Sequence, residues 1–356
     1  MRAAVFRGAG AGQVLVIENR PEPVPQPGEV LIKVKRAGIC GSDLHLTSGE
    51  GIQLATDSII GHEFAGEVVA LGAGVDRIAI GDRLAPMPYV GCGQCPACFA
   101  GRPHHCPRAR FDVIHGFSEY SRVGARDCAR LPDDVSDEEG ALIEPLAVGL
   151  EAVRKSAMPV GARVLVTGAG PIGLAAAFWA QRLGASRIAV MAASARRRQV
   201  ALALGATHFI ARNDTPDPAS AIRDALEGSP DVVLEAVGMS GAIAEAIDFV
   251  KPLGTVVSLG FSSGPDTFVP QVALAKEHGV GIFIYGFFWS RGKRVFDAAL
   301  DRGFLGSARG AGFPFAVMWA NRMPRRVLPV KSARDPLIDP ARLVHTDPED
   351  FLALVR

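Results

Sequence analysis

Several features that would assign this chain to common functional classes are missing from it. Its 38 lysines and arginines are balanced by 37 aspartates and glutamates, so it has no general positive field for nucleic acid or an anionic membrane surface. No apolar run reaches the ~18 residues that a membrane-spanning helix needs. The first eight residues lack the apolar stretch of a secretory signal. We therefore expect a cytoplasmic protein with no nucleic-acid or membrane partner.

A shortage of charge, at 21% of residues against 48% hydrophobic, also excludes a disordered chain. The 356 residues predict two domains, at roughly 150 residues each. The 40 glycines and 25 prolines are spread without a repeat, which indicates many turns between short elements and argues against a solenoid.

The cysteines are only six, and their spacing is not that of a disulfide framework. Cys92, Cys95, Cys98 and Cys106 fall within fifteen residues as C-x2-C-x2-C-x7-C. In a reducing compartment this spacing predicts four thiolates around one structural Zn²⁺ in a lobe at 92–106. A redox cluster or an iron–sulfur cluster is the alternative. Such a closed site has no open coordination position, so chemistry must lie elsewhere. Cys128 is expected to be a small buried apolar residue.

A second set of potential ligands is scattered along the first half of the chain. It combines one thiol, one imidazole and two carboxylates, a mixture that binds Zn²⁺ while leaving a position for water or substrate. The residues are Cys40, His62, Glu63 and Glu144. Taken singly, each is more often a packed core residue or a carboxylate near a helix end.

The segment around Glu144 carries helix signals. Residues 136–139 have the form of a capping box, which predicts the start of a helix. We expect Pro145 to interrupt the helix and to leave Glu144 pointing inward.

A glycine-rich turn follows a short β-branched run at 162–167. The turn is Gly168-Ala169-Gly170-Pro171-Ile172-Gly173, with an alanine-rich helix predicted over about 171–183 and a second strand over 187–191. In that context G-x-G-x-x-G is typical of a dinucleotide-binding turn, where the glycines allow a tight bend and close approach of a pyrophosphate to the helix N-terminus. An ordinary strand-to-helix turn is the alternative.

The position that selects the cofactor lies about twenty residues beyond this turn, where an acid binds the 2′-hydroxyl of NAD. Here it is Ala192, and no acid follows before Asp214. Ser194, Arg196 and Arg197 offer a hydroxyl and guanidinium groups instead, which favours the 2′-phosphate of NADP(H) over NAD(H). The alternative is that the arginines only form the solvated face of the next helix.

Three further β-branched runs, at 207–211, 231–235 and 255–260, alternate with helical or loop stretches. This alternation predicts an α/β fold with a doubly wound parallel sheet of the Rossmann type.

Motifs in the order and spacing of one family cover roughly residues 1–300. They stand at 29–45, 61–69 and 81–83, in the four-cysteine lobe and at Gly168–Gly173. In these motifs the chain resembles the zinc-dependent medium-chain alcohol dehydrogenase family, and most closely its polyol, secondary-alcohol and threonine dehydrogenase-like branch. The resemblance implies a β-rich, GroES-like catalytic domain at 1–150, a Rossmann NAD(P)-binding domain at 151–288, and a return to the catalytic domain over 289–356. It also implies a homodimer or homotetramer.

The resemblance further implies roles for single residues. Cys40, His62 and Glu144 match the protein ligands of a catalytic zinc, with Glu63 able to exchange against water. Ser42 matches a hydroxyl beside the zinc, His45 a distal proton acceptor, and Asp43 an acceptor that orients His62. For Ser42, Asp43 and His45, ordinary turn chemistry after a strand is the alternative. The expected cofactors are therefore two Zn²⁺ per chain and a nicotinamide dinucleotide.

The predicted function is hydride transfer between NADP(H) and a secondary alcohol or polyol, or the corresponding ketone. Two alternatives remain: a non-catalytic dinucleotide-binding protein derived from such an enzyme, and an NAD-dependent polyol or threonine dehydrogenase. A zinc-free quinone reductase would need neither metal-ligand set.

The tail departs from the family. No Asp or Glu occurs from 303 to 334, a basic segment with five arginines and Lys331, and Leu337-Ile338-Asp339-Pro340 comes about thirty residues later than the resemblance implies. We expect the family's last helix and return strand to be missing after Phe351. A basic insertion and a sequence altered by a change of reading frame are both compatible with this pattern.

Overall fold

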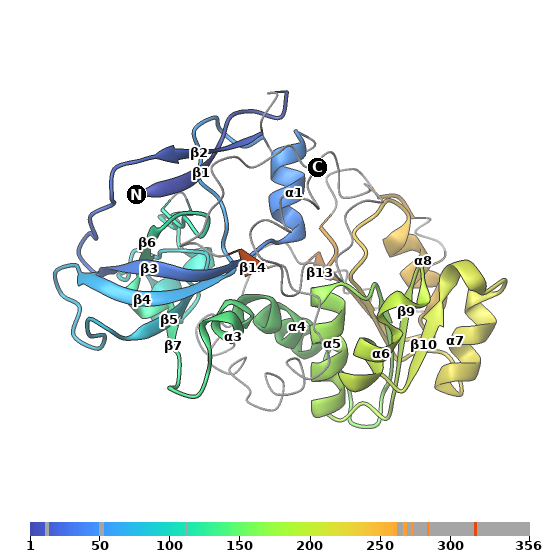
Figure 1. Ribbon diagram of the computed structural model, residues 1–356. Helices are drawn as coiled ribbons and strands as arrows, with labels where there is room; N and C mark the ends of the chain where they lie inside the picture. The colour runs from blue at the N-terminus through green and yellow to red at the C-terminus, as the bar shows by residue number, and fades with distance from the viewer. Residues whose placement is uncertain are drawn as a thin grey trace. The chain divides into compact units, whose positions relative to one another are not determined.

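The computed structural model describes residues 1–10, 14–49, 53–111, 113–261, 266–268 and 272, and the backbone of 283–284 and 317–318. The chain forms two compact units, coloured blue to green and green to orange in Figure 1. The first includes Met1 to Glu144, and the second begins at Pro145. The predictions for 289–356 and for the basic segment 303–334 lie outside the described residues, apart from the backbone of Val317 and Met318.

The first unit is built on a sheet ordered β14-β3-β4-β5-β7, with β6 also paired to β3. Its longest strand, β3, is buried on both faces from Glu29 to Ile32 and then alternates, with the buried Val34 between the less buried Lys33 and Lys35. Phe64 and Leu84 from β4 and β5 complete the apolar contacts. The sheet strands are β3 (Glu29–Gly38), β4 (Phe64–Leu71), β5 (Arg83–Pro86), β6 (Tyr120–Gly124), β7 (Cys128–Arg130) and β14 (Val317–Met318).

Short elements surround this sheet. A hairpin of two antiparallel strands begins the chain, and short helices fill the connections. Cys128 is buried, as predicted, and its thiol donates to the carbonyl of Gly124 at 3.2 Å. The elements are β1 (Arg2–Phe6), β2 (Leu15–Asn19), α1 (Gly41–Ser48), α2 (Pro96–Phe99), η1 (Pro103–His105), η2 (Ala125–Asp127) and α3 (Asp137–Ala141).

The capping box before Glu144 is present, and the helix is interrupted as expected, but at Leu142 between α3 and α4 rather than at Pro145 itself. Ser136 Oγ accepts from the backbone N–H of Glu139, and the Glu139 carboxylate accepts from that of Ser136. Helix α4 (Ile143–Lys155) then runs through Pro145. Pro145 lies in the first turn, where a backbone N–H has no partner inside the helix, so its ring is tolerated. Glu144 is buried, as expected.

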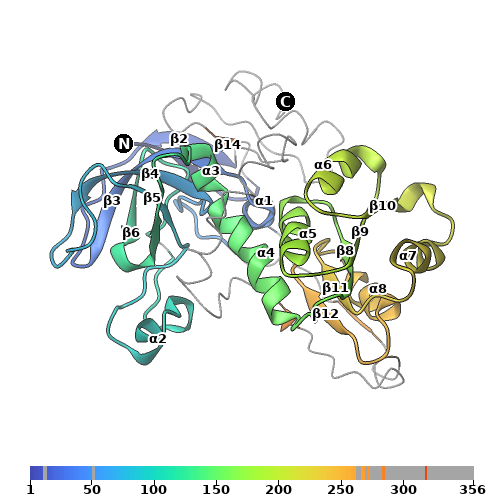
Figure 2. The ribbon, with the colours of Figure 1, turned by 90° about the horizontal axis from the view of Figure 1, so that it is seen from below.

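The second unit contains a six-stranded parallel sheet ordered β10-β9-β8-β11-β12-β13, which confirms the predicted doubly wound fold. In Figure 2, α5 and α6 lie on one face of this sheet and α7 and α8 on the other. Ile222 and Leu226 of α7 and Ile247 of α8 pack against Leu165 and Val233 of the sheet. The strands are β8 (Arg163–Thr167), β9 (Arg187–Ala192), β10 (His208–Ala211), β11 (Val232–Glu235), β12 (Thr255–Ser258) and β13 (Phe283–Ile284).

The helices of the second unit follow the glycine signals of the sequence. Helix α5 ends at Arg182, and Gly184 follows in the left-handed conformation with φ +98°. The elements are α5 (Pro171–Arg182), η3 (Ala195–Arg197), α6 (Arg198–Ala203), η4 (Arg212–Asp214), α7 (Pro218–Leu226) and α8 (Ala242–Phe249).

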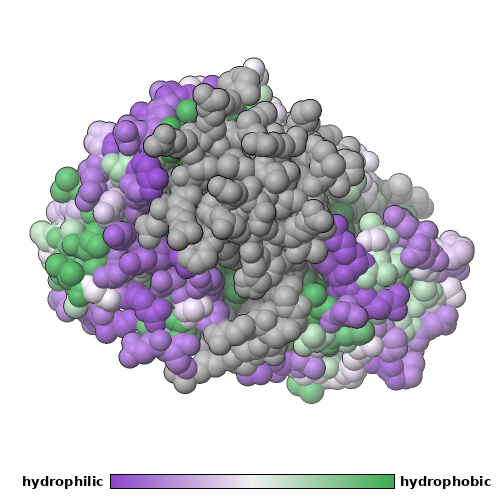
Figure 3. Space-filling view, in the orientation of Figure 1, coloured by the Kyte–Doolittle hydropathy of each residue, from purple (hydrophilic) through white to green (hydrophobic). Residues whose placement is uncertain are grey.

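The described surface visible in Figure 3 is largely hydrophilic, and its apolar residues form small groups. No helix in the described part of the chain is both long enough and apolar enough to span a bilayer.

Candidate metal centres and dinucleotide site

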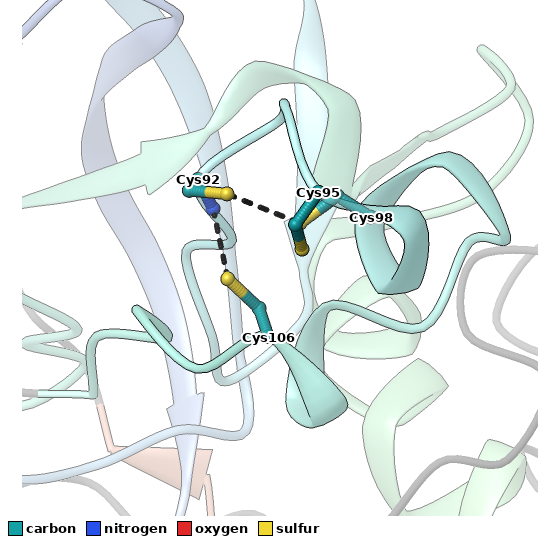
Figure 4. A group of neighbouring side chains, drawn as sticks. All are labelled: Cys92, Cys95, Cys98 and Cys106. Carbon is teal, nitrogen blue, oxygen red and sulfur yellow. Dashed lines mark hydrogen bonds between the residues drawn. The ribbon is translucent and has the colours of Figure 1, made fainter.

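The four clustered cysteines come together on one short lobe (Figure 4). Cys95 caps the N-terminus of α2, Cys98 lies within α2, and Cys106 follows η1. Their Sγ atoms and that of Cys92 all lie within 4.8 Å of one another, and Cys92 Sγ is 4.0 Å from Cys98 Sγ. A tetrahedral zinc site with Zn–S bonds of about 2.3 Å has sulfur–sulfur edges of about 3.8 Å. The lobe therefore has the donor set and the spacing of a four-thiolate zinc site.

Backbone groups of the lobe support negatively charged sulfur. The N–H groups of Cys92 and Arg108 both donate to Cys106 Sγ, at 3.4 and 3.3 Å. A hydrogen bond from the backbone of Gln94 lowers the pKa of the Cys92 thiol to about 6, whereas burial raises that of Cys98 to about 12. The Cys92 thiol thus ionises more readily than usual, and a bound cation would favour ionisation of Cys98 as well.

The second ligand set forms where β3 ends and β4 begins. These strands are antiparallel neighbours with Ala37 opposite Phe64, so the residues just outside them meet. Cys40 follows β3 and caps α1, while His62 and Glu63 immediately precede β4. One ligand atom from each of Cys40, His62 and Glu63 lies within 4.8 Å of the other two. Glu144 is not part of this close group, but it is buried and its charge acts on Glu63.

Asp43 connects two members of this group. Its Oδ2 accepts the backbone N–H of Cys40 at 2.9 Å, and its Oδ1 lies 3.5 Å from Nδ1 of His62. An imidazole that gives Nδ1–H to a carboxylate keeps Nε2 available as a metal ligand. Asp43 is itself only 3% exposed, so this contact is shielded from water.

The charges of the group suit a cation. Burial raises the pKa of Cys40 to about 11 and that of Glu144 to about 7. Burial and then the nearby Glu144 raise the pKa of Glu63 to about 8. Burial alone would lower the pKa of His62, but Asp43 and Cys40 raise it well above its usual value. Cys40 and Glu63, with the charge of Glu144 acting on Glu63, are costly to ionise without a positive partner, and a divalent cation would offset that cost.

The two residues matched to proton transfer both lie on α1. Ser42 is 5% exposed, and its Oγ has no hydrogen-bond partner among the described residues. His45 follows three residues later on the same helix and is half-buried. A buried hydroxyl without a protein partner is suited to bonding a bound molecule.

The glycine-rich turn has the backbone that a dinucleotide requires. Gly168 has φ +94°, and a Cβ there would lie 2.7 Å from the carbonyl oxygen of Ala236. A Cβ on Gly173 would lie 2.0 Å from the carbonyl oxygen of Gly168. Gly170 caps α5 and has open space where its Cβ would be, and Pro171 and Ile172 begin the helix. The helix N-terminus is thus accessible to an anion such as a pyrophosphate.

The structure separates the residues predicted to select the cofactor. Ala192 ends β9, and both Ser194 and Arg196 are exposed beyond it. Arg197 is half-buried, and its Nη1 donates to the carbonyl of Ala169 in the glycine-rich turn at 2.8 Å. Ser194 and Arg196 are therefore at the surface, while Arg197 joins this segment to the turn.

Sequence analysis missed Glu235, the last residue of β11. Its side chain is 1% exposed and accepts three hydrogen bonds at the carboxyl edge of the parallel sheet. The signal was an acid ending the apolar run Asp231-Val232-Val233-Leu234-Glu235.

Family models match most of the chain. A model for the "alcohol dehydrogenase GroES-like domain" matches residues 26–133, and one for "zinc-binding dehydrogenase" matches 171–302. A third, "glycosyltransferase WbsX", matches 262–349 and so overlaps the end of the second.

Individual proteins are similar over most of their length. Sorbitol dehydrogenase of Gallus gallus is 37% identical over 77% of this chain and 80% of its own. L-galactonate-5-dehydrogenase of Escherichia coli (strain K12) is 37% identical over 74% of this chain and 78% of its own. A solved structure from Sinorhizobium meliloti 1021 bound to NADP has TM-score 0.71 and 31% identity, covering 86% of this chain and 90% of that one. One from E. coli CFT073 complexed with NADH has TM-score 0.73 and 30% identity, covering 84% and 87%.

Proposed function

The chain belongs to the zinc-dependent medium-chain alcohol dehydrogenase family, in its polyol dehydrogenase branch, and we propose that it transfers a hydride between NADP(H) and a secondary hydroxyl of a polyol or the corresponding ketone. The observation that carries this proposal is the close group of Cys40, His62 and the buried Glu63. It is accompanied, on the helix that Cys40 caps, by the buried Ser42 hydroxyl, which has no hydrogen-bond partner among the described residues. A protein that only bound a dinucleotide would have no use for this group.

The residues of the first unit divide the work at the reacting oxygen. Cys40, His62 and Glu144 would hold a catalytic zinc, with Glu63 exchanging against water, and Asp43 fixes the ring of His62. When bound, the zinc supplies a Lewis acid for the substrate oxygen and the nicotinamide takes or gives the hydride. Ser42 would accept the proton that leaves the substrate hydroxyl while its own proton leaves toward His45, the distal acceptor, from which the proton passes to solvent.

The preference for NADP(H) rests on the absence of an acid at Ala192 and on the exposure of Ser194 and Arg196. The similar structures with NADP and with NADH leave both cofactors open to the family. Fluorescence titration of the zinc-replete protein with NADPH and NADH tests the preference without any choice of substrate. We expect at least tenfold tighter binding of NADPH. Equal or tighter binding of NADH would overturn the preference, and binding of neither would overturn the proposed function.

The remaining features of the proposal concern the whole protein. Cys92, Cys95, Cys98 and Cys106 would hold a second, structural zinc, giving two per chain. A cytoplasmic location supplies the reducing conditions that these thiolates need. We propose a homodimer or homotetramer. Light scattering coupled to size-exclusion chromatography would measure the mass of the assembly.

A further inference from the structure

We infer that Glu235 is a positioning residue for the dinucleotide, because its buried carboxylate fixes the loop Ala236–Met239 as one side of the cofactor site. The inference rests on the proposed function and concerns a residue with no assigned role. Glu235 ends the strand before this loop, so it would act through the loop rather than on the dinucleotide itself.

Both oxygen atoms of the Glu235 carboxylate accept hydrogen bonds, one from the following loop and the other from the neighbouring strand. Oε1 accepts the backbone N–H groups of Val237 and Gly238 at 2.6 and 2.8 Å, and Oε2 accepts the hydroxyl of Ser258 at 2.8 Å. No lysine or arginine among the described residues forms an ion pair with it. A buried carboxylate held only by hydrogen bonds needs all of them, so its donors are fixed in return.

These bonds join two neighbouring strands at their carboxyl ends. Ser258 lies opposite Glu235 in the parallel register of β11 and β12. Beyond these two residues, the segments that follow β11 and β12 are in backbone contact, since a Cβ on Gly260 would lie 2.1 Å from the backbone nitrogen of Gly238. The loop after β11 is therefore held both by the carboxylate and by its neighbour.

The same loop packs on the glycine-rich turn. Ala236 N–H donates to the carbonyl of Thr167 at 2.8 Å, and the carbonyl of Ala236 occupies the space that a Cβ on Gly168 would need. Gly168 is the first glycine of the turn proposed to bind the pyrophosphate. A shift of the loop would therefore move the turn as well.

The loop also exposes apolar side chains where a ligand ring would lie. Val237 is 46% exposed and Met239 is 54% exposed, although both follow directly on a buried strand. In open parallel sheets, ligands bind outside the carboxyl ends of the strands. These two side chains are suited to covering an aromatic ring or ribose of the dinucleotide.

If Glu235 had only a structural role, replacing it would lower the stability of the protein without changing its affinity for the dinucleotide. A matched control residue lies at the other end of β11. Asp231, just before the amino end of the same strand, accepts the backbone N–H of Arg163 at 2.7 Å and pairs with Lys251. Asp231 is thus also a carboxylate with several partners, but it lies at the amino ends of the strands, whereas the glycine-rich turn lies at their carboxyl ends.

The test compares Glu235→Ala, Glu235→Gln and Asp231→Ala in the full-length, zinc-replete protein. The readouts are the melting temperature and the Kd for NADPH by fluorescence, measured well below melting. We expect Glu235→Ala to raise the Kd at least tenfold. Glu235→Gln should stay within threefold of the unmodified protein, because an amide oxygen accepts both N–H groups and the amide nitrogen donates to Ser258. Asp231→Ala should lower the melting temperature but change the Kd less than twofold.

Two results would overturn the inference: a Kd for Glu235→Ala within twofold of the unmodified protein, or an equal rise in Asp231→Ala. If Glu235→Ala does not fold, Ser258→Ala removes one donor from the same carboxylate, with an expected rise of about threefold; an unchanged Kd there would also count against it. Failure of the unmodified protein to bind NADPH or NADH is a different result, which removes the proposed function itself.

Discussion

At the scale of the residue, the candidate active site depends on a buried carboxylate that would not itself bind the metal. Asp43 accepts from the backbone of Cys40 and faces the ring of His62, so one side chain sets the position of two proposed ligands. Such outer partners control both ring orientation and ligand basicity.

Asp43→Asn should lower the affinity of the catalytic zinc by roughly 10–100-fold, because an amide oxygen stabilises the imidazole donor less than a carboxylate does. Metal analysis after dialysis against a graded chelator would measure this loss. The Kd for NADPH should not change, since the glycine-rich turn belongs to the second unit. Full zinc retention by the variant would contradict the role given to Asp43.

The raised pKa values of the buried acids predict how zinc binding depends on pH. In the metal-free protein, burial and Glu144 hold the pKa of Glu63 near 8, and burial holds that of Glu144 near 7. The folded state thus keeps protons that the unfolded state releases near pH 4.5, so the metal-free protein loses stability as pH rises from about 4.5 to 8. Zinc displaces these protons.

The gain in melting temperature on adding zinc should therefore grow between pH 6 and pH 8. Differential scanning fluorimetry of chelated and reloaded protein would follow it. Glu63→Gln has no proton to lose at that position and should show a smaller increase. A zinc effect that is the same at both pH values would argue against this linkage.

At the scale of the element, several proposed ligands lie in or beside short helices. Helix α2 has only four residues, Pro96–Phe99; Cys95 precedes it and Cys98 lies within it. None of its residues is buried. Bound metal would therefore supply the order that packing does not.

Cys95→Ser should remove the structural zinc while leaving the catalytic one, so the zinc content should fall from about two to about one per chain. We expect the melting temperature to fall by roughly 5 °C or more, because the lobe loses its main stabilising contact. The Kd for NADPH serves as the control and should stay within twofold. A variant that still binds two zinc ions would disprove the four-thiolate assignment.

At the scale of the whole molecule, the residues proposed to bind zinc and move the proton lie in the first unit, and the glycine-rich turn proposed to bind the dinucleotide lies in the second. The tail is matched from residue 262 to 349 by a family model unrelated to dehydrogenases, and residues 303–334 lack acids. A basic insertion that folds with the enzyme and an altered reading frame predict different unfolding behaviour of the purified protein.

If the tail is an insertion that folds with the enzyme, the full chain should have its expected intact mass of 37.5 kDa and one cooperative thermal transition. Mass spectrometry and calorimetry on the same sample would show both. A broad, non-cooperative melt would reject the insertion.

What the sequence by itself determined is local in the chain. The four cysteines within fifteen residues, the glycine-rich turn, the capping box at Ser136 and the missing acid at Ala192 all depend on neighbours a few residues away. For residues this close in the chain, backbone geometry alone decides which side chains can meet. The helix interruption near Pro145 was predicted as well, but its exact place was not, because a shift of one or two residues decides whether the proline falls in the first turn of the next helix.

What only the tertiary structure decided depends on strand pairing. The approach of Cys40 to His62 follows from the antiparallel register of β3 and β4. Arg197 reaches Ala169, and Glu235 reaches Ser258, only because parallel strands end at one edge of the sheet. Sequence spacing does not encode these meetings, since the residues are brought together by hydrogen bonds between strands and by burial of the apolar residues on each face.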